Sequence, residues 1–303
     1  MLKKLILLAA LAAAAPAAAE PMILLPSGHP VAEVKVDGQG PFRFIIDTAA
    51  TSTTVLPALR AALPGGLKVA GTQSLSGAAG QTQIETVSLG TIDVGPRSFT
   101  GLTAFSLPPS PIDKLQVHGV LGSDILARYA LEMDLGNGSW HLHDSAAVAG
   151  VDAMLTVPIT LDEALTPRLS VRLDGVELPA VLDTGAQGTI INWAAAGLFG
   201  LTPGSKGLDK GAAVQGVSAH ATASATRRFG KLEAGAARLA EPKIVIADLP
   251  IFQVLGIADG PAMILGIDAF ASRRIVIDHP GLRLFVDSRA SPAPSALGTA
   301  AAR

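Results

Sequence analysis

The chain has 303 residues, of which 49% are hydrophobic and 16% charged, and its formal net charge is -2 at pH 7. This length and composition allow a sizeable core in one large domain or two ordinary ones, and they exclude general disorder. The near-neutral charge, the lack of a basic patch and the 4% of aromatic residues give no support to nucleic acid or an anionic membrane as a partner.

Residues 1–19 predict a secretory signal peptide. Lys3 and Lys4 supply a basic start, a short apolar run follows, and three alanines precede Glu20 as a cleavage signal. The apolar run is short for a membrane span and ends at Pro16. The chain has no Cys, which excludes disulfides, a thiol nucleophile and a lipid anchor on a cleaved Cys. We therefore expect a periplasmic or secreted protein with no stable membrane span after cleavage.

The chain beyond the signal is expected to be mostly β, because short apolar runs alternate with Gly, Pro, Asp and Ser. Residues 31–47 predict a strand, a turn at Asp37-Gly38 and a second strand that ends at Asp47. A polar segment with glycines, residues 74–85, predicts a mobile hairpin. Residues 119–135 then predict a short helix after Gly122, followed by a strand.

The second half of the chain repeats this order. Residues 169–183 predict strand, turn and strand ending at Asp183, and residues 212–224 form the second polar segment with a glycine. Asp lies two and twelve positions after the Gly in each half: Asp124 and Asp134 after Gly122, and Asp268 and Asp278 after Gly266. The chain is therefore two copies of one unit, residues 22–147 and 152–288, with a Pro-, Ala- and Ser-rich tail at 289–303 that we expect to be disordered.

Each half thus contains an apolar-apolar-Asp-Thr motif, a glycine-bearing hairpin and an apolar-apolar-Gly element. This arrangement resembles the aspartic protease superfamily and, more narrowly, retropepsin-like (retroviral-type) proteases in their bacterial, exported, two-repeat form. The resemblance implies a bilobal acid-protease fold, made of two retropepsin-like repeats with a cleft between them. It implies an aspartic endopeptidase that hydrolyses an extended polypeptide substrate. Both repeats share one chain, so we expect a monomer, with no cofactor and no metal.

The resemblance assigns catalysis to Asp47 and Asp183. Hydrolysis without a metal or covalent intermediate needs a water held between a proton acceptor and a proton donor, and two adjacent carboxyls that share one proton supply both. The family pattern implies that Thr48 and Thr184 form hydrogen bonds across the interface between the lobes. It also implies that Gly185 lets the backbone pass close to a carboxylate.

The first motif departs from the family pattern, because it reads Asp-Thr-Ala with Ala49 in place of Gly. If that position needs a positive φ, Ala costs on the order of 1 kcal/mol. Ala50 and Ala186 lie where related enzymes often have Ser or Thr. Without a hydroxyl that donates to the carboxylate, we expect a higher pKa of the pair and activity in mild rather than strong acid.

The resemblance predicts two flaps over the cleft, with Gly77 and Gly80 at one tip and Gly216 at the other. Hairpins of this kind close over an extended peptide through main-chain hydrogen bonds. The chain's single Tyr, Tyr129, lies in the helix predicted after Gly122 and not in a flap, so the flap is of the retroviral type. His220 lies in the second flap segment, where solvent exposure is the simpler interpretation.

Other interpretations stay open beside these. Either Asp could be an ordinary turn residue, and the four Asp residues after Gly122 and Gly266 are most simply structural caps. His141 and His143 share one face of a strand and could ligate a metal, although solvated histidines at a strand end are more common. The whole chain could instead be a protease-like module that binds peptides without cutting them, which Ala49 favours. A structural envelope protein is a third candidate, but it gives no reason for paired Asp-Thr turns.

Overall fold

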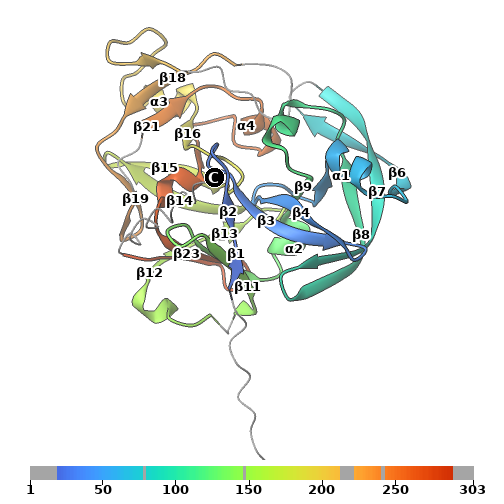
Figure 1. The fold of residues 1–303 in the computed structure, drawn as a ribbon. Helices are drawn as coiled ribbons and strands as arrows, with labels where there is room; N and C mark the ends of the chain where they lie inside the picture. The colour runs from blue at the N-terminus through green and yellow to red at the C-terminus, as the bar shows by residue number, and fades with distance from the viewer. Residues whose placement is uncertain (1–18, 78–79, 146–147, 212–221, 240–242, 289–303) are drawn as a thin grey trace, which may run out of the picture.

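The computed structural model describes residues 19–77, 80–145, 148–211, 222–239 and 243–288. It confirms a mostly β protein with two lobes. In Figure 1 the first lobe, blue to cyan, lies beside the second lobe, yellow to orange, and a sheet built from both halves of the chain lies below them. No helix in the described part of the chain is long and apolar enough to cross a membrane.

The sheet of the first lobe has eight strands in the order β2-β3-β4-β9-β5-β8-β7-β6. They are β2 (Ile23–Leu24), β3 (Pro30–Val36), β4 (Gln39–Ile46), β5 (Thr54–Val55), β6 (Lys68–Gly77), β7 (Gly80–Val94), β8 (Arg97–Ser106) and β9 (Gly119–Leu121). Side chains alternate along β3, where Val34 and Val36 are buried while Glu33 and Lys35 are exposed. This period of two covers one face of the sheet with the core.

The sheet of the second lobe follows the path β17-β18-β21-β16-β22-β15-β14-β19-β20, and β13 pairs with β14 beside it. Its strands are β13 (Thr160–Leu161), β14 (Pro167–Leu173), β15 (Val176–Leu182), β16 (Ile190–Ile191), β17 (Asp209–Lys210), β18 (Ala225–Arg228), β19 (Leu232–Ala234), β20 (Ala237–Arg238), β21 (Lys243–Ile246) and β22 (Met263–Leu265).

The third sheet joins the two halves in the order β1-β11-β10-β23-β24-β12. Its strands are β1 (Glu20–Pro21), β10 (Ala130–Asp134), β11 (Ser139–His143), β12 (Leu155–Pro158), β23 (Arg274–Asp278) and β24 (Arg283–Val286). Its centre is the antiparallel pair β10 and β23, one from each repeat. Continuous pairing across this sheet holds the two lobes together. The division of the chain into residues 22–147 and 152–288 stays a prediction.

Helices are few and short. They are α1 (Pro57–Ala62), α2 (Ser123–Leu126), α3 (Trp193–Gly197) and α4 (Ile251–Val254), with 3₁₀ turns η1 (Pro111–Leu115), η3 (Val151–Ala153) and η4 (Ile267–Phe270). The helices predicted after Gly122 and Gly266 are therefore present, as α2 and as the 3₁₀ turn η4. The first of these helices is shorter than expected, because α2 ends at Leu126 and Tyr129 lies in the bend beyond it.

The predicted hairpin turns are confirmed in both repeats. Asp37 and Gly38 both have positive φ, at 50° and 73°, and Asp174 and Gly175 have φ of 44° and 87°. Two consecutive residues with positive φ match the twist of the flanking antiparallel strands. The turns make β3–β4 and β14–β15 equivalent hairpins, and the second strand of each hairpin leads into one of the Asp-Thr motifs.

Candidate active site

The two Asp-Thr motifs occupy equivalent places in the two lobes. β4 runs parallel to β9, and β15 runs parallel to β22. The amide of Asp47 continues the first ladder by donating to Leu121 O at 3.1 Å, and the amide of Asp183 continues the second by donating to Leu265 O at 3.0 Å. Each Asp therefore begins its loop at the end of a central buried strand, which fixes its backbone.

Thr48 and Thr184 bind each other across the interface between the lobes. Thr48 Oγ1 donates to Leu182 O and Thr184 Oγ1 donates to Ile46 O, both at 2.8 Å. Each hydroxyl also accepts the amide of the other Thr at 3.1 Å. Both side chains are fully buried. The role expected for these two residues is therefore matched by the geometry, and the four bonds hold the two Asp loops together.

The carboxyl groups of Asp47 and Asp183 hydrogen-bond to each other. Oδ1 of Asp47 accepts the amides of Ala49 and Ala50 at 2.8 and 2.9 Å, and Oδ1 of Asp183 accepts the amide of Ala186 at 2.9 Å. Both residues are partly exposed, so the pair is accessible from one side. The structure thus brings together two carboxyls that lie 136 positions apart in the chain.

Burial raises the pKa of both carboxyls, and it does so unequally. Burial raises the pKa of Asp183 well above its usual range, and the charge of Asp47 raises it further. Burial also raises the pKa of Asp47, but the two amide donors and the hydrogen bond from Asp183 oppose this. Since adjacent like charges cannot both be ionised cheaply, the pair keeps one proton, which belongs to the pair and not to either residue.

Gly185 leaves room for the carboxylate of the other lobe. A Cβ built on Gly185 would lie 2.4 Å from Cγ of Asp47 and 2.4 Å from its Oδ2. No side chain fits there without moving Asp47, so the close approach expected at Gly185 is present. It arises from proximity and not from a positive φ, because Gly185 has an ordinary backbone conformation.

Ala49 carries no backbone strain. It is absent from the residues with positive φ in the described part of the chain. Its methyl packs against an apolar cluster of the second lobe that includes Val181 and Ile264. The penalty considered for a positive φ therefore does not arise, and the third residue of the first motif contributes a contact between the lobes.

A second layer of hydrogen bonds supports each Asp loop. Thr53 donates its amide and its hydroxyl to Oδ1 of Asp124, each at 2.8 Å, and Thr189 Oγ1 donates to Oδ1 of Asp268 at 2.7 Å. Asp124 and Asp268 are therefore structural, as expected. Sequence analysis missed their partners, although Thr53 and Thr189 each lie six residues after an Asp of the pair.

Gly122 and Gly266 permit tight crossings beneath the loops. A Cβ at Gly122 would lie 2.4 Å from the carbonyl carbon of Ser52, and one at Gly266 would lie 2.6 Å from that of Gly188. Both glycines are thus structural. Ser123 Oγ, beside the first of them, donates to Thr48 O at 3.1 Å, a further support that the sequence did not indicate.

β6 and β7 form a hairpin in the segment where the first flap is predicted. Gly77 pairs with Gly80 at its described end. Beyond the Glu85–Ser106 pair, β7 has no further pairing with β8, and β6 contacts α4 of the second lobe. The hairpin therefore extends across from one lobe to the other. Gly216 and His220, predicted for the second flap, lie outside the described residues.

The remaining predicted residues have structural partners. Oδ1 of Asp134 accepts the amides of Gly136 and Asn137 in a turn, at 3.0 and 2.9 Å. Oδ1 of Asp278 accepts the amide of Gly281 at 3.0 Å, and its Oδ2 accepts from Arg283 at 2.9 Å. These contacts confirm both Asp residues as turn and cap residues.

The rings of His141 and His143 lie close together and are tilted by 51°, with centroids 4.3 Å apart. His143 Nε2 lies 2.6 Å from Oε2 of Glu132, so one possible metal-binding nitrogen is occupied by a carboxylate. Among the residues that the structure describes, no three His, Cys, Asp or Glu side chains form a group that could hold a metal ion. The two histidines are therefore part of the sheet that joins the lobes.

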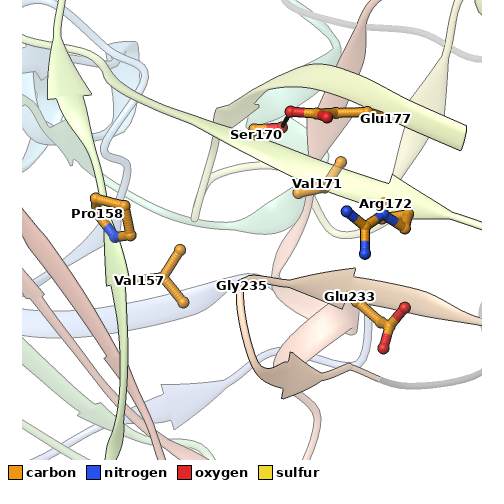
Figure 2. Close-up of a pocket in the computed structure, with 8 residues that line it drawn as sticks. All are labelled: Val157, Pro158, Ser170, Val171, Arg172, Glu177, Glu233 and Gly235. Carbon is orange, nitrogen blue, oxygen red and sulfur yellow. Dashed lines mark hydrogen bonds between the residues drawn. The ribbon is translucent and has the colours of Figure 1, made fainter. Parts of the chain in front are cut away.

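A pocket of about 230 Å³ in the second lobe contains neither Asp of the pair. Figure 2 shows Val157 and Pro158 on one strand, with Val171 and Arg172 on another strand across the pocket. Arg172 lies between two cross-strand carboxylates, those of Glu177 and Glu233. Mixed surface charges of this kind are ordinary for a sheet. This pocket is therefore separate from the Asp pair.

Two lobes that each supply an Asp-Thr loop to one adjacent pair of Asp residues define the fold of an aspartic protease. A family model described as aspartyl protease matches residues 32–125 and 169–269, which is more than half of the chain. The chain belongs to this aspartyl protease family, and the two matched regions confirm its retropepsin-like repeats.

Solved structures agree on the fold. The crystal structure of conglutin gamma, a basic 7S globulin from lupine seeds, is similar with a TM-score of 0.54 and 12% identity. Basic 7S globulin from soybean is similar with a TM-score of 0.50 and 11% identity. Each likeness covers 90% of this chain and 95% of the globulin. A search of curated protein sequences finds no match. At these identities the likeness shows the fold alone.

Proposed function

We propose that this protein is an exported aspartic endopeptidase that hydrolyses peptide bonds of an extended polypeptide. The observation that carries the proposal is the hydrogen-bonded pair of Asp47 and Asp183, whose pKa values are raised unequally. A structural role alone needs no such pair, because burying two adjacent carboxyls opposes folding. Catalysis by a shared proton does need it.

In this mechanism a water molecule lies between the two carboxyls. The ionised carboxylate of the pair takes a proton from the water, while the protonated carboxyl donates its proton to the carbonyl oxygen of the substrate. The oxygen of the water then bonds to the carbonyl carbon, and a tetrahedral diol forms. Its collapse breaks the C–N bond as a proton passes to the leaving amine. Thr48, Thr184 and Gly185 act by holding the two carboxyls in place.

The alternative is a peptide-binding module that does not cut. Two observations favour it. The two similar solved structures are named globulins, and Ala49 replaces the Gly of the family pattern. Ala49 is weaker support than the sequence suggested, because the residue has no positive φ. Both carboxyls and both Thr residues are retained, so we favour the enzyme.

Export and the monomeric state belong to the same proposal. The predicted cleavage point precedes Glu20, which is also the first residue of β1 in the sheet that joins the lobes. Removal of residues 1–19 would therefore leave every described strand intact. One chain supplies both Asp residues, so a second copy is not needed to complete the pair.

The test uses residues 20–303 and the Asp183→Asn variant, each incubated with a diverse peptide mixture between about pH 4 and 8, where a raised carboxyl pair would titrate. Mass spectrometry reads the products. We expect cuts from the parent that are absent with Asp183→Asn. A folded parent protein that makes no cut anywhere in this range would favour the binding module.

A further inference from the structure

Arg60 contacts both strands at the base of the first flap. This residue lies on α1, and its Nη1 pairs with Oε2 of Glu85 and donates to Oγ of Ser106 at 2.9 Å. Glu85 and Ser106 are also the last paired residues between β7 and β8. One guanidinium thus bridges both strands at the point where the flap leaves the sheet.

A pocket of about 410 Å³ lies beside this contact. Its apolar wall consists of Ile84, Leu107 and three prolines, and its polar wall includes Arg60 and Glu85. Leu107 belongs to the same apolar cluster as Ala50, whose amide donates to Asp47. The pocket is lined by α1, by the β7 strand of the flap and by residues 106–109, all in the lobe that carries Asp47.

The polar wall of the pocket has hydrogen-bond donors on Arg60 and an acceptor on Glu85. Among the described residues, no hydrogen bond engages Nε or Nη2 of Arg60, or Oε1 of Glu85. Both side chains are partly exposed, at 39% and 34%. Because the two charges pair, a charged ligand would gain from one and be repelled by the other. A neutral carboxamide can accept from the guanidinium and donate to the carboxylate.

We propose that this pocket is a substrate subsite that selects Gln or Asn, and that Arg60 and Glu85 determine the selection. The apolar wall takes the methylene stem of the side chain, and the ion pair takes its amide end. This inference rests on the proposed function, since it describes a substrate for the same Asp pair. It names the side chain that the substrate presents beneath the flap.

The test compares the parent with Glu85→Gln and Arg60→Met in cleavage of a randomised peptide library. The parent should enrich Gln or Asn at one fixed position relative to the cut. Glu85→Gln leaves the guanidinium unpaired and should shift that position toward Glu and Asp by about fivefold. Arg60→Met leaves the carboxylate unpaired and should shift it toward Lys and Arg. Arg172→Met and Glu177→Gln, in the pocket of Figure 2, are matched controls and should change nothing.

Two different failures can be told apart. Cleavage with an unchanged preference in both variants overturns the subsite and leaves the proposed function standing. No cleavage by the folded parent counts against the proposed function, and the subsite is then tested by binding. For that purpose the same library is captured on each protein, and the bound peptides are sequenced. Opposite charge shifts in the two bound pools support the subsite, and identical pools overturn it.

Discussion

Thr48 and Thr184 each donate a hydroxyl to the carbonyl that precedes the Asp of the other lobe, at 2.8 Å in both directions. The same hydroxyls accept the amides of the opposite Thr. Each lobe therefore satisfies buried backbone groups of the other, and neither Asp loop is complete alone. Loss of one hydroxyl affects both carboxyls at once.

We expect Thr184→Val to lower the free energy of unfolding by roughly 3 kcal/mol, because it leaves Ile46 O and the amide of Thr48 buried without a partner. Thr184→Ser keeps the hydroxyl and should cost about 1 kcal/mol or less. Urea unfolding measures both variants. A loss from Thr184→Ser as large as that from Thr184→Val would contradict this account, because the hydroxyl would then contribute no more than the methyl group.

Gly185→Ala should leave the protein folded and reduce kcat/KM by about 100-fold or more, because its Cβ would displace the Asp47 carboxylate. Gly188→Ala is the matched control, since a Cβ there meets nothing within 4 Å. Ala49→Gly should change activity less than about threefold, as Ala49 is unstrained. Steady-state kinetics on one peptide compares the three. A large gain from Ala49→Gly would mean that the methyl impairs the site.

The pH profile of kcat/KM should be bell-shaped with its maximum in mild acid. Burial raises the pKa of both carboxyls, so the pair keeps its single proton to higher pH than an isolated Asp would. Activity falls as pH rises through the upper pKa of the pair, where the shared proton is lost, and falls again in stronger acid, where the second carboxyl is protonated. Ala186→Ser adds a donor and should move the profile toward lower pH. A parent optimum at about pH 2, as for pepsin-like pairs, would contradict this account.

His279 should make the folded state sensitive to acid. Burial lowers the pKa of this His from 6.5 to about 4, and its Nε2 has no hydrogen-bond partner among the described residues. The unfolded state then binds a proton below pH 6.5 that the folded state does not bind. Stability is therefore complete above that pH and declines by roughly 3 kcal/mol as the pH falls to about 4.

His279→Asn removes the titrating ring and should flatten this decline, even if it lowers stability at neutral pH. The measurement is urea unfolding at several pH values for both proteins. Parallel curves of unfolding free energy against pH would show that His279 does not contribute to the acid sensitivity.

Much of the site could be predicted because the chain contains the same unit twice. Asp47 and Asp183 were each ambiguous alone, and the repeated pattern around them favoured a paired site over two ordinary turn residues. The turns at Asp37 and Asp174 were predictable for the same reason, since local turn chemistry decides them. The helix after Gly122 was expected to be longer, because its end depends on packing and not on a sequence signal.

Contacts between distant segments could not be predicted. The sheet that joins the lobes pairs β10 of the first repeat with β23 of the second. The sequence of neither strand indicates a partner in the other repeat. Whether Ala49 is strained depends on the backbone φ, and its contact with Val181 depends on how the lobes meet. The pairing of Arg60 with Glu85, 25 positions apart, carries no signal in the sequence. Pairings of this kind depend on tertiary structure, which one sequence does not specify locally.

The central claim is that the two carboxyls act as one catalytic unit. It is tested by measuring kcat/KM on one cleaved peptide for Asp47→Asn, Asp183→Asn and the double variant. We predict that each single change reduces kcat/KM by at least about 1000-fold and that the double variant is no worse than either, as for residues that act together. Substantial activity in either single variant, or losses that multiply in the double variant, would contradict the shared role of Asp47 and Asp183.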